Sequence, residues 1–168
     1  MALESNTGLG VFNNYGPTTT EGKFGAEIGE GVIKTVVYDI SWQDLSSTSA
    51  GAVTKLDYVF PIGSTFMSCQ YVVDEAIVGP TAITAGTYLA SDGTTAHDAD
   101  GLMTAAVGVV TALDAVGDRV IGTGALLATG TGAGFAVTAP VVVRILPTVA
   151  AATAGKMRVF ITYLSPAP

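Results

Sequence analysis

The sequence predicts an all-β protein, a jelly-roll-like β-sandwich of about eight strands preceded by an extended N-terminal arm. Several segments alternate between apolar and polar residues with a period of two, as half-buried strands do. Clusters of Gly, Pro, Ser and Thr separate these segments, which is typical of sandwiches and barrels. Residues 1–31 show neither a helical nor a strand period. We therefore divide the chain into an arm, residues 1–31, and one β domain, residues 32–168.

The arm combines scattered glycines with more apolar side chains than a disordered tail carries. Fixing about thirty backbones costs on the order of 30–60 kcal/mol, whereas burying one large apolar side chain returns only about 1.5–3 kcal/mol. We therefore predict that the arm becomes ordered on a partner, by pairing along a sheet edge or groove and by inserting apolar side chains. A terminus without fixed structure is the alternative. The predicted partner-binding residues are Leu9, Val11, Phe12, Tyr15 and Phe24.

Eight segments of the body have strand character. In the first of them, Val36, Tyr38 and Ile40 are spaced two residues apart, so their side chains lie on the same face of the strand. Turn residues end the segments, as Pro61 and the Gly79-Pro80 pair do for the second and third. The predicted strands are 32–42, 55–60, 64–77, 82–90, 102–113, 119–128, 135–146 and 156–164.

Alternation also assigns the faces of the third and the last strands. In the third, one face carries Met67, Cys69, Tyr71 and Val73, and the other carries Phe66, Ser68, Gln70 and Val72. In the last, one face carries Met157, Val159, Ile161 and Tyr163, and the other carries Arg158, Phe160, Thr162 and Leu164.

Two further segments are assigned from their residue types. The Ser91-Asp92-Gly93 triplet predicts a turn after the fourth strand. Residues 102–116 fit helical spacing as well as strand spacing, but Gly108 and the surrounding β-branched residues favour a strand. We predict a strand to Leu113 and a tight turn over 114–118.

Charge and composition narrow the class of partner. Seven basic and fourteen acidic residues give a net charge of −7, and the basic residues are spread singly, so nucleic acid is not an expected partner. Charged residues make up only 12% of the chain, and the mean hydropathy is +0.52. A monomer with so few charges tends to associate. We therefore expect much of the surface to be buried against other chains.

The single cysteine, Cys69, excludes an internal disulfide and a cysteine-based metal cluster. Alternation with Met67 and Tyr71 predicts a buried, unreactive thiol. The first residues lack a basic segment followed by an apolar one, so we expect no signal peptide. The uncharged stretch 120–143 is interrupted by glycines and Pro140, so we expect no membrane span and no membrane partner.

The one acidic cluster runs from Asp92 to Gly101. Alternating carboxylates in such a loop suit Ca²⁺, yet the EF-hand pattern fails because both the acidic first position and the glutamate at the twelfth are missing. We predict a solvated hairpin tip. A weak cation site with Asp98 and Asp100 as ligands is the alternative, and no other metal or cofactor site is expected.

Searches for catalytic patterns fail, so we do not expect an enzyme and name no catalytic residue. His97 is the only histidine, and no G-x-S-x-G nucleophile motif occurs. Asp74 and Glu75 are adjacent on a strand, which predicts opposite faces and no cooperating carboxylate pair. Tyr38 and Trp42 share a predicted face and suit the stacking of a sugar ring, but we expect core packing instead.

Several segments resemble small proteins encoded beside the major capsid gene of tailed bacteriophages. They are LGVFNNYGP at 9–17, TEGKFG at 20–25, DG at 92–93, DADGL at 98–102, TALDAVGD at 111–118 and VFITYLSP at 159–166. The resemblance implies a head decoration, or cement, protein. Such a protein is a β-sandwich on the capsid exterior, often trimeric, which clamps neighbouring capsid subunits and needs no catalytic residue.

The expected function is therefore structural, with the virion as location and assembly in the host cytoplasm. The expected partners are the major capsid protein and further copies of the chain in a homotrimer. A carbohydrate- or receptor-binding β-sandwich on the virion surface, using the loop from Asp92 to Gly101, is the alternative.

Overall fold

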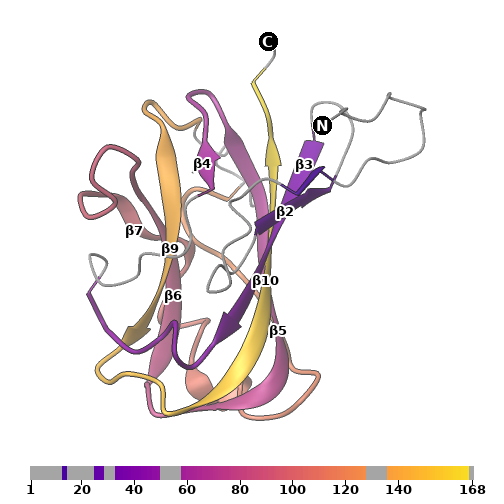
Figure 1. The fold of residues 1–168 in the computed structure, drawn as a ribbon, viewed down its shortest axis with the longest axis vertical. Helices are drawn as coiled ribbons and strands as arrows, with labels where there is room; N and C mark the ends of the chain where they lie inside the picture. The colour runs from indigo at the N-terminus through magenta and orange to yellow at the C-terminus, as the bar shows by residue number, and fades with distance from the viewer. Residues whose placement is uncertain (1–12, 15–24, 29–32, 50–57, 128–135, 167–168) are drawn as a thin grey trace.

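The computed structural model describes residues 13–14, 25–28, 33–49, 58–127 and 136–166 (Figure 1). Within these ranges the chain forms strands and one short 3₁₀-helix, η2 (Val110–Ala112), but no α-helix. The protein is all-β, as the sequence predicts. The strands are β1 (Asn13–Asn14), β2 (Gly25–Ile28), β3 (Ile33–Ser41), β4 (Val59–Phe60), β5 (Thr65–Val78), β6 (Ala82–Leu89), β7 (Ala96–Met103), β8 (Arg119–Ile121), β9 (Val141–Thr148) and β10 (Ala154–Leu164).

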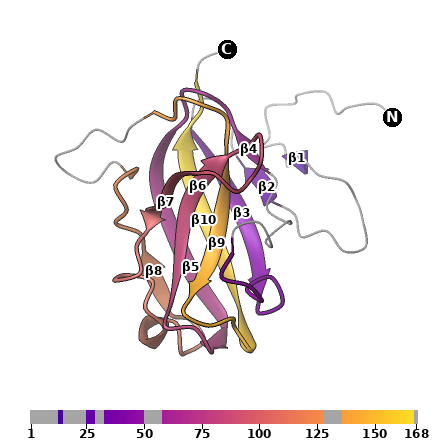
Figure 2. The ribbon, with the colours of Figure 1, turned by 90° about the vertical axis from the view of Figure 1, so that its left-hand side faces the viewer.

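The strands form two antiparallel sheets (Figures 1 and 2). Sheet A has the order β1-β2-β3-β10-β5-β8, and sheet B has the order β4-β9-β6-β7. Strands adjacent in the chain are often in different sheets, so the chain repeatedly crosses between the two. The connections between the strands therefore lie at the two ends of the molecule (Figures 1 and 2).

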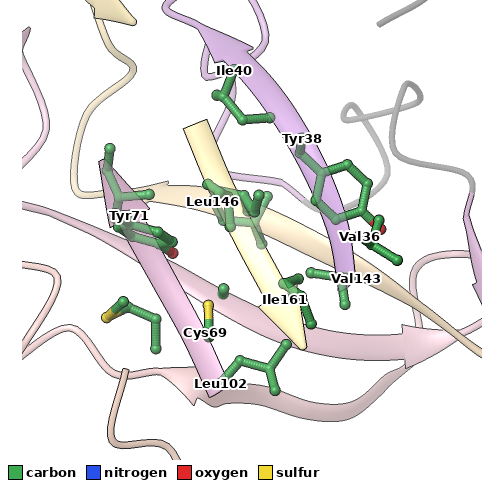
Figure 3. Packing of buried hydrophobic residues seen from close by; sticks show 14 of the residues in the cluster. Val36, Tyr38, Ile40, Cys69, Tyr71, Leu102, Val143, Leu146 and Ile161 are labelled. Atoms are coloured by element: carbon green, nitrogen blue, oxygen red, sulfur yellow. The ribbon is translucent and has the colours of Figure 1, made fainter. Parts of the chain in front are cut away.

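One hydrophobic core lies between the sheets (Figure 3). Sheet A contributes Val36, Tyr38 and Ile40 from β3, which confirms the predicted face of this strand. The predicted apolar face of the last strand is confirmed as well. In β10 the buried residues are Met157, Val159, Ile161 and Tyr163. Sheet B contributes apolar side chains from β6, β7 and β9 to the same cluster.

The predicted face of β5 is right for Cys69, Tyr71 and Val73, which are buried, and wrong for Met67, which is 40% exposed. Phe66, predicted on the outer face, is fully buried. The reason is a register shift, since Ser68 pairs with Thr162 while Phe66 pairs with the next residue of β10. Met67 is the additional residue of a β-bulge, and a bulge reverses the alternation beyond it.

The predicted strand at 102–113 is wrong beyond Met103, where β7 ends. Turns and the helix η2 follow instead. The amide of Ile83 donates to the carbonyl of Gly108 at 2.7 Å, and a Cβ on Gly108 would lie 2.0 Å from the Ile83 oxygen. This backbone contact with β6 holds the segment as a loop, and a local propensity for strand does not reveal it.

Three other predicted strands are shorter or shifted. Of the segment 119–128, only β8 is a strand. The residues after β8 change their hydrogen-bonding partner from β5 to β7, because the Gly122 amide donates to Cys69 of β5 and the Leu126 amide donates to Gly101 of β7. Strand β9 starts at Val141, after Pro140, and continues to Thr148. Of the segment 55–60, β4 occupies the last two residues, and 50–57 lies outside the described residues.

Two described parts of the predicted arm belong to sheet A, and only β2 pairs directly with the body. Strand β2 is antiparallel to β3, with Ala26 opposite Val37, and β1 is antiparallel to β2. The pairing of β2 therefore extends sheet A beyond β3. The predicted anchor residues are not among the described ones, so their role stays a prediction. They are Leu9, Val11, Phe12, Tyr15 and Phe24.

Candidate functional site

The acidic cluster is split between a turn and a strand. Asp92 lies in the predicted turn, where its Oδ1 accepts hydrogen bonds from the amides of Thr94 and Thr95 at 2.9 Å. The Thr95 hydroxyl donates to Oδ2 of the same carboxylate. Asp98 and Asp100 lie instead on β7, so the predicted hairpin tip covers only the first part of the cluster.

Hydrogen bonds from Thr95 and Thr94 lower the pKa of Asp92 from 3.8 to about 2. A lowered pKa in the folded protein makes the ionised carboxylate a source of stability above pH 3.8, and this contribution disappears as the pH falls toward 2. We expect an NMR titration to place the Asp92 carboxyl near pH 2. We also expect Asp92→Asn to lose less stability than the wild type between pH 4 and pH 2, as measured by urea unfolding, because its side chain does not titrate. An equal loss in both proteins would contradict this role.

The structure does not assemble a metal centre from the predicted candidates. Asp98 is half-buried and Asp100 is exposed on β7. His97, which precedes Asp98, forms a 3.2 Å hydrogen bond between its Nδ1 and the Thr87 hydroxyl. Over the described ranges, no three His, Cys, Asp or Glu side chains are grouped so as to hold a metal ion. Asp98 and Asp100 as ligands of a weak cation site remain a prediction.

Cys69 is fully buried on β5, which confirms the predicted buried thiol. Loss of solvation raises the pKa of Cys69 to about 12. The thiolate is the reactive form of cysteine, so this side chain is not a nucleophile in the folded protein.

The prediction that Asp74 and Glu75 lie on opposite faces is wrong. Lys156 pairs with Glu75 in the β5–β10 ladder and Met157 pairs with Val73, which leaves Asp74 as an additional residue. This bulge turns both carboxylates toward the outer face. There, Asp74 accepts two hydrogen bonds from Arg158, at 2.8 and 2.9 Å, and Glu75 accepts one from Lys156 at 2.6 Å. Each carboxylate is held by its own cation, so the two form surface ion pairs.

Tyr38 and Trp42 do not form a sugar-stacking platform. Tyr38 is buried in the core, as predicted, whereas Trp42 follows the end of β3 in a turn and is exposed. Core packing is thus confirmed for Tyr38 and wrong for Trp42, because the strand ends at Ser41 and alternation does not extend into the turn.

Three uncharged segments meet at one end of the molecule, and we call this group of segments the charge-free end. It consists of the β5–β6 turn (78–81), the β7–β8 loop up to η2 (104–112) and the β9–β10 turn (148–154), which lie together at the bottom of Figures 1 and 2. The sequence has no Asp, Glu, Lys or Arg in these ranges. Charged residues border it, among them Asp44, Asp114 and the Glu75–Lys156 pair.

Hydrogen bonds join these three segments into one surface. The Thr81 amide donates to the Thr148 carbonyl at 3.2 Å, and the hydroxyls of the same two residues lie 2.9 Å apart. The Thr153 amide donates to Val78, and the Val110 amide donates to Thr81. The segments are far apart in the sequence, so only these contacts reveal the charge-free end. In the sequence, the charge-free end is visible only as three separate uncharged runs, and a search for motifs does not detect them.

The charge-free end exposes apolar side chains. Val149 is 84% exposed and Val78 is 52% exposed. Val149 has a φ of 70°, and the Ala150 amide donates to the Thr148 carbonyl across it. These are the features of a γ-turn with positive φ, a rare and strained conformation, and a β-branched residue is unusual in it. The strain is thus located at the most exposed apolar side chain of this end.

A row of uncharged residues crosses the outer face of sheet A, next to charged neighbours such as Arg158 and Arg119. Phe160 of β10 lies between Val37 of β3 and Gln70 of β5, and Ile121 of β8 follows Gln70. Ile121 is 63% exposed. The Asp74–Arg158 ion pair limits this area on the side toward the charge-free end.

No protein-family model matches the chain, and no curated protein or solved structure is significantly similar to it. Among the described residues, no helix has the length and apolar character that crossing a membrane requires.

Proposed function

We propose that the protein is a structural virion protein that binds the outside of a phage capsid. It stabilises the shell by clamping neighbouring capsid subunits, through the arm at residues 1–31 and through self-association as a homotrimer. The segments that resemble phage decoration proteins, at 9–17, 98–102 and 159–166 among others, support this assignment.

The strand order supports a jelly-roll class for the body. When β3 to β10 are counted as strands one to eight, sheet A has the order 1-8-3-6 and sheet B has the order 2-7-4-5. This is the order of two interleaved Greek keys, which defines the jelly roll, and jelly rolls occur in viral capsid proteins and also in lectins. The fold alone does not select a function.

The proposal rests mainly on the uncharged areas and exposed apolar side chains at the surface of the body. The body has two uncharged areas: the charge-free end, with the exposed Val78 and Val149, and the row around Phe160 on the outer face of sheet A, with the exposed Ile121. Exposed apolar areas of this kind mark contacts with other proteins. A shell built of many identical subunits also multiplies weak contacts, because each bound copy raises the effective concentration of the next contact.

Binding of the full-length chain to shells tests the proposal. We expect Phe12→Ala with Tyr15→Ala to weaken binding by about tenfold or more, because aromatic anchors dominate most interfaces. The measurement is co-sedimentation with purified capsids of the phage that encodes the chain, from which the protein has been removed. As a matched control, Val59→Ala with Ile62→Ala removes exposed apolar side chains of the body that lie in neither of these areas. Undiminished binding by the arm variant would contradict the clamping role of the arm.

A further inference from the structure

We propose that Tyr58 and Tyr163 form a modification site, at which a peroxide acting by one-electron steps couples the two rings into a dityrosine. The cross-link joins sheet B to sheet A, because Tyr58 immediately precedes β4 and Tyr163 is in β10. It is independent of the proposed function, since it needs neither a capsid nor the arm. Three features support it: the contact between the two phenols, the partial exposure of one of them, and the burial of the thiol.

The two hydroxyl groups are already in contact. Their oxygen atoms lie 2.6 Å apart, at hydrogen-bond distance, and a phenol can both donate and accept. The ring centroids are 6.3 Å apart, with an interplanar angle of 63°. Dityrosine forms between the Cε atoms, which are bonded to the carbon that carries the hydroxyl. The atoms that form the new bond therefore belong to the ends of the rings that meet, so coupling needs no large movement of the backbone.

Phe60 holds the two rings together and makes the pair distinctive. Its ring lies 4.9 Å from that of Tyr58 and 4.9 Å from that of Tyr163. Over the described ranges, no other two tyrosines form a ring contact. A phenoxyl radical formed at this place thus has one neighbouring phenol with which to couple.

Exposure directs an oxidant to this pair. Tyr58 is half-buried and gives access from solvent, whereas Tyr163 is buried. Burial raises the pKa of Cys69 to about 12, which withholds the thiolate that peroxides attack most readily. Met67 and Trp42 are exposed and are separate targets. Their oxidation adds oxygen, whereas the coupling of two tyrosines removes two hydrogen atoms, so mass distinguishes the products.

The step balances with persulfate as the peroxide. Each phenol loses one electron and its hydroxyl proton, which gives two phenoxyl radicals. The radicals form one carbon–carbon bond between their Cε atoms. Each of these carbons then releases its hydrogen as a proton, and each phenol oxygen takes up a proton. The net loss is two electrons and two protons: persulfate takes the electrons and its O–O bond breaks to give two sulfate ions, while the protons enter the solvent.

Brief illumination of the full-length protein with persulfate and a ruthenium trisbipyridyl complex tests the site. We expect a monomer that has lost two hydrogen atoms, in which tandem mass spectrometry joins Tyr58 to Tyr163. Tyr58→Phe and Tyr163→Phe should each lose this product, because phenylalanine gives no phenoxyl radical. The matched control is Tyr71→Phe, which removes a buried phenol whose hydroxyl has no hydrogen-bond partner among the described residues. It should form as much product as the wild type.

Urea unfolding provides a second readout. The cross-link joins positions 105 residues apart, so it restricts the unfolded chain strongly. We expect the oxidised wild type to unfold at a urea concentration higher by about 1 M or more than the untreated protein, while treated Tyr58→Phe keeps its own midpoint. The phenylalanine variants retain the ring and should fold, as circular dichroism will show.

Three outcomes would overturn the inference: no product lacking two hydrogen atoms in the wild type, the same product in Tyr58→Phe, or coupling only between separate chains. These measurements contain no shells. A failure here would therefore remove the modification site and leave the proposed shell binding intact, whereas undiminished co-sedimentation of the arm variant would contradict the clamping role and leave this site intact.

Discussion

Phe60→Ala is expected to lower the free energy of unfolding by about 3–5 kcal/mol. Phe60 is fully buried on β4, and its ring lies 4.9–5.0 Å from the rings of Tyr58, Phe66 and Tyr163 in edge-to-face contacts. Alanine would leave a cavity and remove all three contacts, and aromatic pairs add stability beyond the area that they bury. Urea unfolding followed by intrinsic fluorescence measures the loss.

The neighbouring residue supplies the control for this experiment. Val59 is in the same two-residue strand but is 48% exposed. Val59→Ala should change the free energy of unfolding by no more than about 0.5 kcal/mol, as is usual at the surface. If the two variants lost the same stability, the aromatic cluster around Phe60 would not be a main part of the core.

Gly155→Ala is expected to destabilise the fold by about 3 kcal/mol or more, through backbone strain and steric overlap together. Gly155 has a φ of 114° and lies at the register shift between β10 and β5. A Cβ at this position would lie 2.5 Å from the Ala76 oxygen and 2.7 Å from the Ile77 Cα. These are backbone atoms of β5, so neither can move without breaking the ladder. Urea unfolding is again the measurement.

Gly117→Ala separates strain from overlap. Gly117 also has a positive φ, 91°, but a Cβ there would meet no atom within 4 Å. Its replacement should therefore cost only the conformational strain, about 1–2 kcal/mol. Equal losses at the two glycines would show that the close packing of Gly155 against β5 contributes little.

Periodicity predicted the parts of the fold in which one strand follows a regular alternation. The buried residues of β3 and β10 are those expected, because each strand has one face on the core and one on solvent. The same rule failed at Met67 and at Asp74, where one extra residue enters β5. A bulge depends on the register of the partner strand, and the alternation of a single strand carries no record of that register.

The chemistry of the candidate site was predictable only in part. The sequence indicated the turn at Asp92 and the buried thiol of Cys69, because both depend on local patterns. It grouped Asp92, Asp98 and Asp100 in one loop, whereas the structure places the last two on β7. Where a strand starts depends on its pairing with β6, which is a contact between segments.

The sequence by itself determined the all-β class, the low charge and the buried faces of the regular strands, because these follow from composition and from a period of two. Only the tertiary structure decided that residues 78–81, 104–112 and 148–154 meet at one end. Each of these runs is unremarkable alone. The hydrogen bonds of Thr81 with Thr148 and Val110 bring them together, because long-range pairing decides which loops share an end of the molecule.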